Sequence, residues 1–195
     1  GAGAAYLQGT RATITSSTGS RNRAANSPGL RFHDHGAAQA RADLTNVTIA
    51  ENVAFGSNGG GMWLSYSPTG TVRNCTIANN HSTAADQVAG AIFGGGLVLV
   101  NTIVSGNTAQ WTPGCDKTHG GGATNLQWPS GALCTTSPLV ADPLLGALGD
   151  HGGDTETLVP DATSPARGLG TSCPATDQRG MPRGEPCTAG AVEVP

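Results

Sequence analysis

Short apolar runs, each preceded by small residues, recur along the first half of the chain. These runs are three to five residues long and bounded by Gly, Asn and Ser, which is typical of β-strands. No segment shows a sustained apolar period of 3.6 residues, so we expect no helices. These runs are Ala4-Ala-Tyr-Leu7, Gly29-Leu-Arg-Phe32, Gly61-Met-Trp-Leu64 and Gly90-Ala-Ile-Phe93.

A second block follows each run and aligns without gaps. The four copies are residues 14–22, 44–52, 72–80 and 99–107. The last residue of each copy is Asn, with steps of 30, 28 and 27 residues between copies. A repeat of this length, with two or three short strands, predicts one coil of a parallel β-solenoid, which becomes stable when several coils stack.

The recurring Asn residues predict a ladder at one corner of the coils, because stacked Asn amides can bond one another. The ladder candidates are Asn22, Asn52, Asn80 and Asn107. An inner position recurs as Ser16, Asn46, Asn74 and Asn101. Three of these Asn residues also begin glycosylation sequons, which we interpret as repeat chemistry.

The coil pattern, with its Asn-x-Thr-Ile and Gly-Gly-Gly elements, resembles the right-handed parallel β-helix surface proteins of bacteria. Residues 114–195 resemble the C-terminal region of proteins with a choice-of-anchor Q type domain. The matching strings are Asp142-Pro-Leu-Leu-Gly146, Asp150-His-Gly-Gly153, Ser164-Pro-Ala166, Asp177-Gln-Arg-Gly-Met-Pro-Arg183 and Cys187-Thr-Ala-Gly-Ala-Val-Glu193. The resemblance implies an all-β, right-handed parallel β-helix of about four coils over 1–113. It also implies a secreted or surface-tethered protein without a defined activity.

Residues 114–195 lose the repeat and become rich in Pro and Gly, so we predict an irregular cap over the last coil, in the same structural domain. Its charged residues Asp177, Arg179, Arg183 and Glu193 could pin the cap through charge-assisted hydrogen bonds.

Five cysteines bear on the cap and on the compartment. The four outside the coils allow three pairings. We favour the local pairs Cys115–Cys134 and Cys173–Cys187, because each pair brackets a Gly/Pro-rich stretch. Cys75 occupies a core position of a coil and is expected to stay reduced and inert. Paired cysteines indicate an oxidising, extracellular location.

The net charge is −3, only 12% of residues are charged, and Lys117 is the sole lysine. This composition excludes a basic nucleic-acid footprint. No run of 18 apolar residues occurs, so we do not expect membrane insertion.

Catalytic candidates are weak. A polysaccharide lyase or hydrolase would need acids grouped with a base or with a second carboxylate. Within the coils, Asp34 and Asp86 could share a side with Arg31 or Arg73. A carbohydrate-active enzyme is therefore the alternative function, and we expect none of these residues to be catalytic.

Metal candidates are equally sparse, and we predict no cofactor. His33 and His35 would project to one side of a strand and could bind a transition metal with a third ligand. Asp150 and Asp154 flank a Gly turn that could hold Ca²⁺, but they lack the carboxylate density of an EF-hand loop.

Aromatic residues support a binding surface instead. Trp63 and Tyr66 lie three residues apart near an expected loop, and Trp111 lies beyond the last coil; exposed aromatics stack on sugars and anchor protein contacts. The alternative is that they shield the coils from solvent. The sequence therefore predicts an extracellular structural or adhesive module whose partner is a glycan, a protein or another copy of itself.

Overall fold

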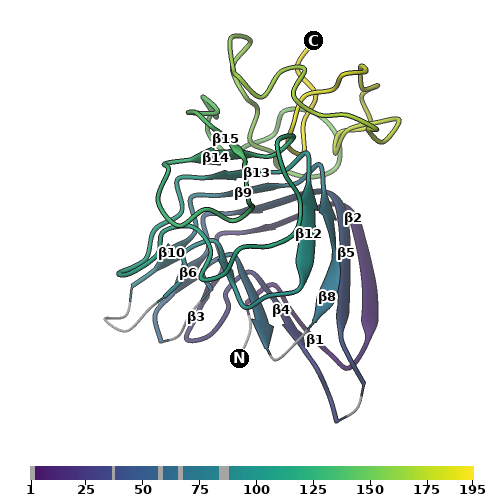
Figure 1. Ribbon diagram of the computed structural model, residues 1–195. Coiled ribbons are helices and arrows are strands. Elements are labelled where there is room, and N and C mark those ends of the chain that lie inside the picture. Colours follow the sequence, from purple (N-terminus) through teal and green to yellow (C-terminus); the bar gives the residue numbers. More distant parts are fainter. Residues whose placement is uncertain (1–2, 37, 57–58, 66–67, 84–87) are drawn as a thin grey trace.

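The protein is a parallel β-solenoid in a computed structural model that describes residues 3–36, 38–56, 59–65, 68–83 and 88–195. No helix occurs within these ranges, and no described segment has the helical length and apolar character that a membrane span requires. Figure 1 shows the stacked strands with the irregular C-terminal segment lying across one side of them.

Three sheets form the walls of the solenoid. Sheet A contains β1 (Ala5–Gln8), β4 (Leu30–His33), β7 (Met62–Ser65) and β11 (Ile92–Phe93). Sheet C contains β3 (Arg23–Ala24), β6 (Val53–Ala54) and β10 (His81–Ser82). Sheet B contains β2 (Arg11–Ser20), β5 (Arg41–Ala50), β8 (Thr69–Arg73), β9 (Thr76–Ala78), β12 (Leu97–Val100), β13 (Ile103–Ser105), β14 (Leu126–Trp128) and β15 (Leu139–Val140).

All pairings between these strands are parallel, as stacked coils require. The four strands of sheet A form successive rungs, so the first and the fourth are three turns apart. Residues 14, 44, 72 and 99 pair in register, as the repeat predicted. Residues 114–140 extend the stack through isolated bridges and two further strands, since β14 pairs with β13 and β15 pairs with β14.

The four apolar runs overlap the strands of sheet A, and the strand pairing sets their register. Ile92 pairs with Met62, and Phe93 pairs with Trp63. The physical reason is alternation: Ile92 is fully buried in the core, so its neighbour Phe93 lies on the outer face.

Sheet B bends in every coil at the inner repeat position. Ser16, Asn46, Asn74 and Asn101 all have positive φ, from 44° to 54°. Asn tolerates this left-handed conformation better than most residues, which explains its recurrence here. The bend divides sheet B into a first limb, which ends at these residues, and a second limb, which follows them.

The outer Asn positions form the ladder that the repeat predicted. Nδ2 of Asn22, Asn52 and Asn80 each donates to Oδ1 of the ladder Asn in the next coil, over 2.9 Å at every step. Asn52, Asn80 and Asn107 are buried, and their amides also bond backbone carbonyls of neighbouring coils. Asn46, Asn74 and Asn80 are 5% exposed or less, so their sequons are inaccessible in the folded chain.

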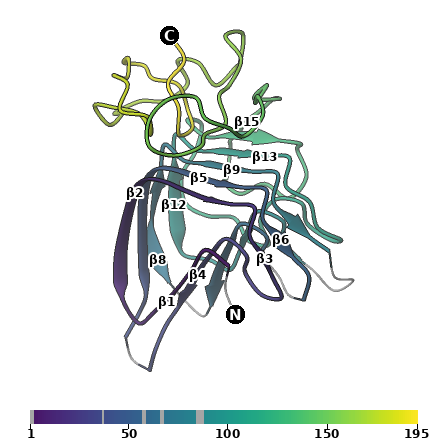
Figure 2. The same ribbon diagram turned by 180° about the vertical axis from the view of Figure 1, so that it is seen from behind.

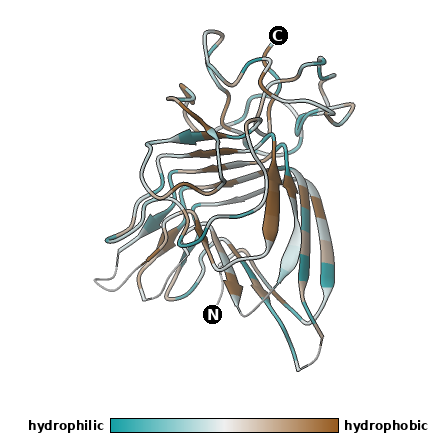
Figure 3. Cartoon of the chain, viewed as in Figure 1, coloured by the Kyte–Doolittle hydropathy of each residue, from teal (hydrophilic) through white to brown (hydrophobic). Residues whose placement is uncertain are grey.

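The core lies inside the coils and consists of the inward side chains, which alternate with outward ones along the strands. Its largest fully buried members include Phe32, Leu44, Ile49, Leu64 and Ile77. Cys75 is buried within it as a free thiol, and desolvation raises its pKa to about 12. Figure 3 shows β12 as uniformly hydrophobic, whereas the C-terminal segment has mixed colouring.

Residues 141–195, here called the wrap, do not lie only over the last coil as expected. They run along the outer face of the second limb of sheet B and contact all four repeats, through Thr18, Asn46, Asn74 and Asn101. The reason is that this face presents Thr, Ala and Ile side chains, which the wrap buries with Leu145, Leu148 and Leu158. Figure 2 shows the same placement from behind.

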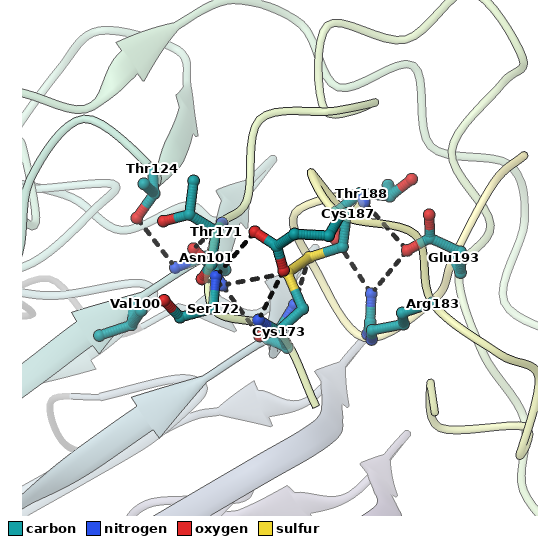
Figure 4. Close-up of a disulfide and its surroundings, with 12 residues drawn as sticks. Val100, Asn101, Thr124, Thr171, Ser172, Cys173, Arg183, Cys187, Thr188 and Glu193 are labelled. Carbon is teal, nitrogen blue, oxygen red and sulfur yellow. Dashed lines mark hydrogen bonds and ion pairs between the residues drawn. A yellow bond between two sulfur atoms is a disulfide. The ribbon is translucent and has the colours of Figure 1, made fainter. Parts of the chain in front are cut away.

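Both local disulfides are present. Cys115–Cys134 closes the rung beyond the fourth coil, and Cys173–Cys187 lies within the wrap. Figure 4 shows the second disulfide beside Asn101, whose Nδ2 donates to the Thr171 carbonyl over 2.9 Å. This disulfide therefore sits where the wrap meets the inner Asn corner.

The charged residues assigned to pinning form one buried network. Asp177 accepts bonds from Arg179 Nε and from the backbone N–H groups of Met181 and Glu193. Arg183 pairs with the Glu193 carboxylate at 3.2 Å and donates to Asn46 Oδ1 at 3.0 Å. The network joins residues 177–183 to Glu193 within the C-terminal part of the wrap and ties this part to the second coil through Asn46.

Candidate ligand-binding site

The outer face of sheet A carries a column of large side chains. In β4 and β7 buried and half-exposed residues alternate, because successive strand residues face opposite sides. The register places Tyr6, Arg31, Trp63 and Phe93 in one outward column. Figures 1 and 2 both place β1 and β4 on the side of the molecule away from the wrap, so this face stays open.

Arg31 lies between two aromatic rings of the column. Its Cζ is 3.7 Å from the ring centroid of Trp63 and 5.0 Å from that of Tyr6. The ring of Phe93 continues the column with an edge contact to Trp63, at 6.3 Å between centroids. Cation–π contacts at both ring faces hold the guanidinium in place, each contributing about 0.5–1 kcal/mol.

A groove of about 470 Å³ opens on this column. It is lined by Arg31, His33, Trp63, Leu64, Ser65, Phe93, Gly94, Asp116 and Lys117. His33 also lines a second hollow of about 520 Å³, together with Gln8, Asp34, His35 and Gly36. The shared His33 makes the two hollows neighbours along sheet A, so an extended ligand could occupy both.

Asp116 and Lys117 come from the rung beyond the fourth coil. Ile92 and Cys115 form a parallel bridge, so the residues that follow them, Phe93 and Asp116, are neighbours on adjacent rungs. Asp116 therefore continues the outward column. Asp116 Oδ1 accepts the Gly94 N–H over 2.7 Å, and desolvation raises the pKa of this carboxyl despite that bond. Lys117 is exposed at the rim of the groove. The groove thus ends in one carboxylate and the only lysine of the chain.

Two buried polar atoms of the groove have no partner among the described residues. They are Arg31 Nε and Ser65 Oγ. A buried unpaired donor costs about 1–3 kcal/mol, so such atoms mark where a ligand or water supplies the missing bond. Both belong to residues that line the same groove.

Glycines shape the closed end of the groove. Gly94 has φ +96°, and a Cβ there would lie 2.0 Å from the Leu64 carbonyl oxygen. Only glycine therefore lets the chain turn from sheet A into sheet B while its N–H reaches Asp116. The Gly-Gly-Gly stretch thus has a structural explanation.

Asp34, a catalytic candidate, and the metal candidates His33 and His35 all line the second hollow. Asp34 Oδ1 accepts the Ala40 N–H at 2.7 Å, and His35 Nδ1 bonds Gln8 Nε2 at 2.9 Å. His33 lines both hollows. Within the described ranges no three His, Cys, Asp or Glu side chains gather as a metal site would require.

Other predicted site residues are not brought to this face. Arg73, at the end of β8 in sheet B, donates to the Ser172 carbonyl of the wrap over 3.1 Å. Trp111 is 70% exposed and does not line the groove. Asp86, a weak catalytic candidate, and Tyr66, a predicted ligand-binding residue, lie outside the described residues. Arg31 and Arg73 are therefore on separate faces.

The predicted calcium pair lies in the wrap. Asp150 Oδ1 accepts the Gly152 N–H at 3.0 Å, which closes a local turn. Asp154 is exposed, and neither residue belongs to a three-ligand group in the part of the chain that is described.

Sequence reasoning missed Tyr6 in the outward column, and Ser65, Phe93, Asp116 and Lys117 in the lining of the groove. For Tyr6 and Phe93 a signal was present, because both belong to the apolar runs that recur in each coil. Ser65 lies just after such a run. Asp116 and Lys117 follow the repeat, so the pattern gave no coil position for them.

A family model described as "Right handed beta helix region" matches residues 1–127. The chain belongs to this family. No curated protein and no solved structure matches the chain. In this right-handed β-helix, the match covers every strand of sheet A and ends within β14, so most of the wrap lies beyond it.

Proposed function

We propose that this β-helix is a non-catalytic binding module of a secreted or surface-attached bacterial protein, with glycan chains as its partner. The observation that carries the proposal is the outward column of Tyr6, Arg31, Trp63 and Phe93 over an open groove. Aromatic rings pack against the apolar faces of sugar rings, and polar groups beside them bond the hydroxyls.

The geometry of the scaffold supports a chain-like ligand. Neighbouring rungs of a sheet lie about 4.8 Å apart, so the column with Asp116 at its end extends over about 19 Å. Tyr6, Arg31, Trp63 and Phe93 sit on strands and not on loops, which keeps them in place before a ligand arrives. The groove therefore suits several consecutive units of an extended polymer.

The two disulfides suggest an oxidising compartment, because such bonds persist mainly outside the cytosol. Bacterial origin and attachment to a surface rest on the resemblance of the coils and of residues 114–195 to secreted surface proteins. Together these points favour an adhesive role outside the cell.

A carbohydrate-active enzyme is the second candidate, and Asp116 favours it. Its raised pKa and its place in an aromatic groove are what a general acid requires. A hydrolase also needs a second carboxylate across the scissile bond. Asp34, the other acid lining the two hollows in the described ranges, has one oxygen bonded to the Ala40 N–H.

The test is a binding and turnover experiment with the folded, disulfide-bonded chain. Glycan arrays followed by calorimetry measure binding, and reducing ends and unsaturated products are followed with calcium and with chelator. We expect binding without turnover, and Trp63→Ala to weaken binding at least tenfold. Trp111→Ala is the matched control, since this exposed Trp lies outside the groove.

Each other outcome has a defined meaning. Turnover that Asp116→Asn abolishes would replace the proposal with the enzyme. A partner that is a protein or a second copy, captured through the same face without any glycan binding, would overturn the glycan assignment. Equal loss in Trp63→Ala and Trp111→Ala would show that the groove is not the site.

A further inference from the structure

The positive charges of the groove form no ion pair with a carboxylate of the described residues, although Asp116 lines the same groove. Five arginines of the described residues are ion-paired with carboxylates: Arg11, Arg21, Arg41, Arg179 and Arg183. Arg31 and Lys117 are not among them, although the chain carries a net charge of −3. In an overall acidic chain, two cations that pair with no described carboxylate thus line one groove.

The environment of Arg31 leaves a hydrogen-bonding position open. The rings of Trp63 and Tyr6 cover the guanidinium, and its buried Nε has no partner among the described residues. Arg recognises carboxylate and sulfate oxygens through several N–H donors in one plane, which a sugar hydroxyl matches less well. An anionic oxygen would satisfy this donor and the positive charge together.

Asp116 and Asp34 are the acids that line the two hollows, and Lys117 acts electrostatically on Asp116 without forming an ion pair with it. Asp116 Oδ1 is held by the Gly94 N–H, and Asp34 Oδ1, in the neighbouring hollow, by the Ala40 N–H. Neither carboxylate lies within ion-pair distance of Arg31 or Lys117 in the described structure. His33, which lines both hollows, and His35, in the second hollow, are the remaining titratable groups of the lining.

We infer that the groove binds anionic glycans, with Arg31 and Lys117 pairing with the carboxylate or sulfate groups while sugar rings stack on Trp63 and Phe93. This inference rests on the proposed glycan-binding function and adds the charge of the ligand. It also assigns binding roles to Lys117, Ser65 and Phe93, which the sequence pattern did not indicate.

Calorimetry with four probes of matched length tests the inference. The probes are an oligogalacturonate, a chondroitin sulfate oligosaccharide, a neutral xylo-oligosaccharide and poly-glutamate. We expect at least one acidic sugar to bind tenfold more tightly than the neutral one. The affinities of the two acidic probes show whether carboxylate or sulfate groups are preferred. Raising NaCl from 50 to 500 mM should weaken that binding several-fold, since exposed ion pairs are screened.

Variants identify the residues. Arg31→Gln and Lys117→Gln should each weaken acidic-sugar binding about tenfold and leave neutral-sugar binding within twofold. Lys117→Arg should retain most of the affinity because it keeps the charge. Arg167→Gln is the matched control: Arg167 is an exposed arginine of the wrap that bonds backbone carbonyls. Circular dichroism and thermal unfolding establish that each variant is folded.

The outcomes separate this inference from the proposed function. Neutral-sugar binding that equals acidic-sugar binding and is lost in Trp63→Ala would overturn the charge assignment and leave the glycan module standing. Binding of poly-glutamate as tight as that of the acidic sugars would also overturn the inference, because the groove would then recognise the negative charge alone and not the sugar rings. No binding of any glycan would overturn both.

Discussion

The outer face of sheet A and the outer face of the second limb of sheet B are built by the same coils, yet only one is covered. On sheet A, long and aromatic side chains alternate with core residues and face solvent. On the second limb, Thr48, Ala50, Thr76 and Ala78 face outward and are buried beneath the wrap. Small side chains let an irregular segment approach a sheet closely, whereas bulky ones hold it away.

This difference teaches that a solenoid leaves the use of its outer faces undecided. The inward residues of both faces are equally apolar and buried, because every coil must fill the same core. The outward residues then determine whether a face becomes an internal interface or a surface for a partner. Four predictions test this division, ordered by their expected effect on the free energy of unfolding.

The largest effect is expected at Asp177, in the charged network that ties the wrap to the coils. Asp177→Asn should lower the free energy of unfolding by about 4 kcal/mol, because it leaves the Arg179 guanidinium and three backbone N–H groups with a poorer acceptor at a fully buried position. Urea denaturation measures the loss, and limited proteolysis should show cleavage in residues 141–195 first. Asp154→Asn, an exposed wrap position, serves as control. Equal stability of the two variants would contradict the pinning role.

The Asn ladder should come next. Asn80→Ala should cost about 3 kcal/mol, since the Asn52 amide and the Ile49 carbonyl lose their partners inside the stack. Its exposed neighbour offers a control: Asn79→Gly keeps the positive φ of 56° accessible and should change stability by about 0.5 kcal/mol or less. Thermal and chemical unfolding of both variants give the comparison. A loss of unfolding free energy below about 1 kcal/mol in Asn80→Ala would show that the ladder does not stabilise the stack.

A pH-dependent effect is expected beside the groove. Burial, with a smaller effect of Lys117, lowers the pKa of His119 to about 4, whereas an unfolded histidine titrates near 6.5. Between these values the unfolded chain binds a proton that the folded chain does not, so stability falls as the pH drops from about 6.5 to 4. By linkage, the loss should reach about 3 kcal/mol at pH 4.

Denaturation at several pH values measures this loss against His119→Gln, which lacks the titrating group. The nearby Asp116, whose pKa is raised, acts in the opposite direction and is common to both proteins. The difference between wild type and variant should therefore change with pH only in the stated window. A difference that is constant from pH 7 to 4 would refute the buried neutral imidazole.

The smallest effect on stability is expected at the open face. Arg31→Ala should cost about 1 kcal/mol, the value of its two ring contacts. Chemical denaturation checks this, with Arg183→Ala, whose side chain is 1% exposed, as the contrasting arginine that should cost far more. If both substitutions cost the same, the distinction between a binding face and an internal interface would fail.

Much of the architecture followed from the sequence. The recurrence of Asn22, Asn52, Asn80 and Asn107 predicted both the length of a coil and the ladder, because in a solenoid one residue per coil occupies the same corner. Proximity in sequence was enough for the disulfides, since each joins two segments of one local loop.

The tertiary structure decided what repeats do not encode. It laid the wrap along sheet B, because covering Ala50 and Ile103 with distant leucines is a match between surfaces and not between neighbours in sequence. It also brought Asp116 and Lys117 to the column that begins at Tyr6, more than a hundred residues earlier. Local spacing fixes the coil and its inward residues, whereas the outer faces acquire their partners only when distant segments meet on the folded stack.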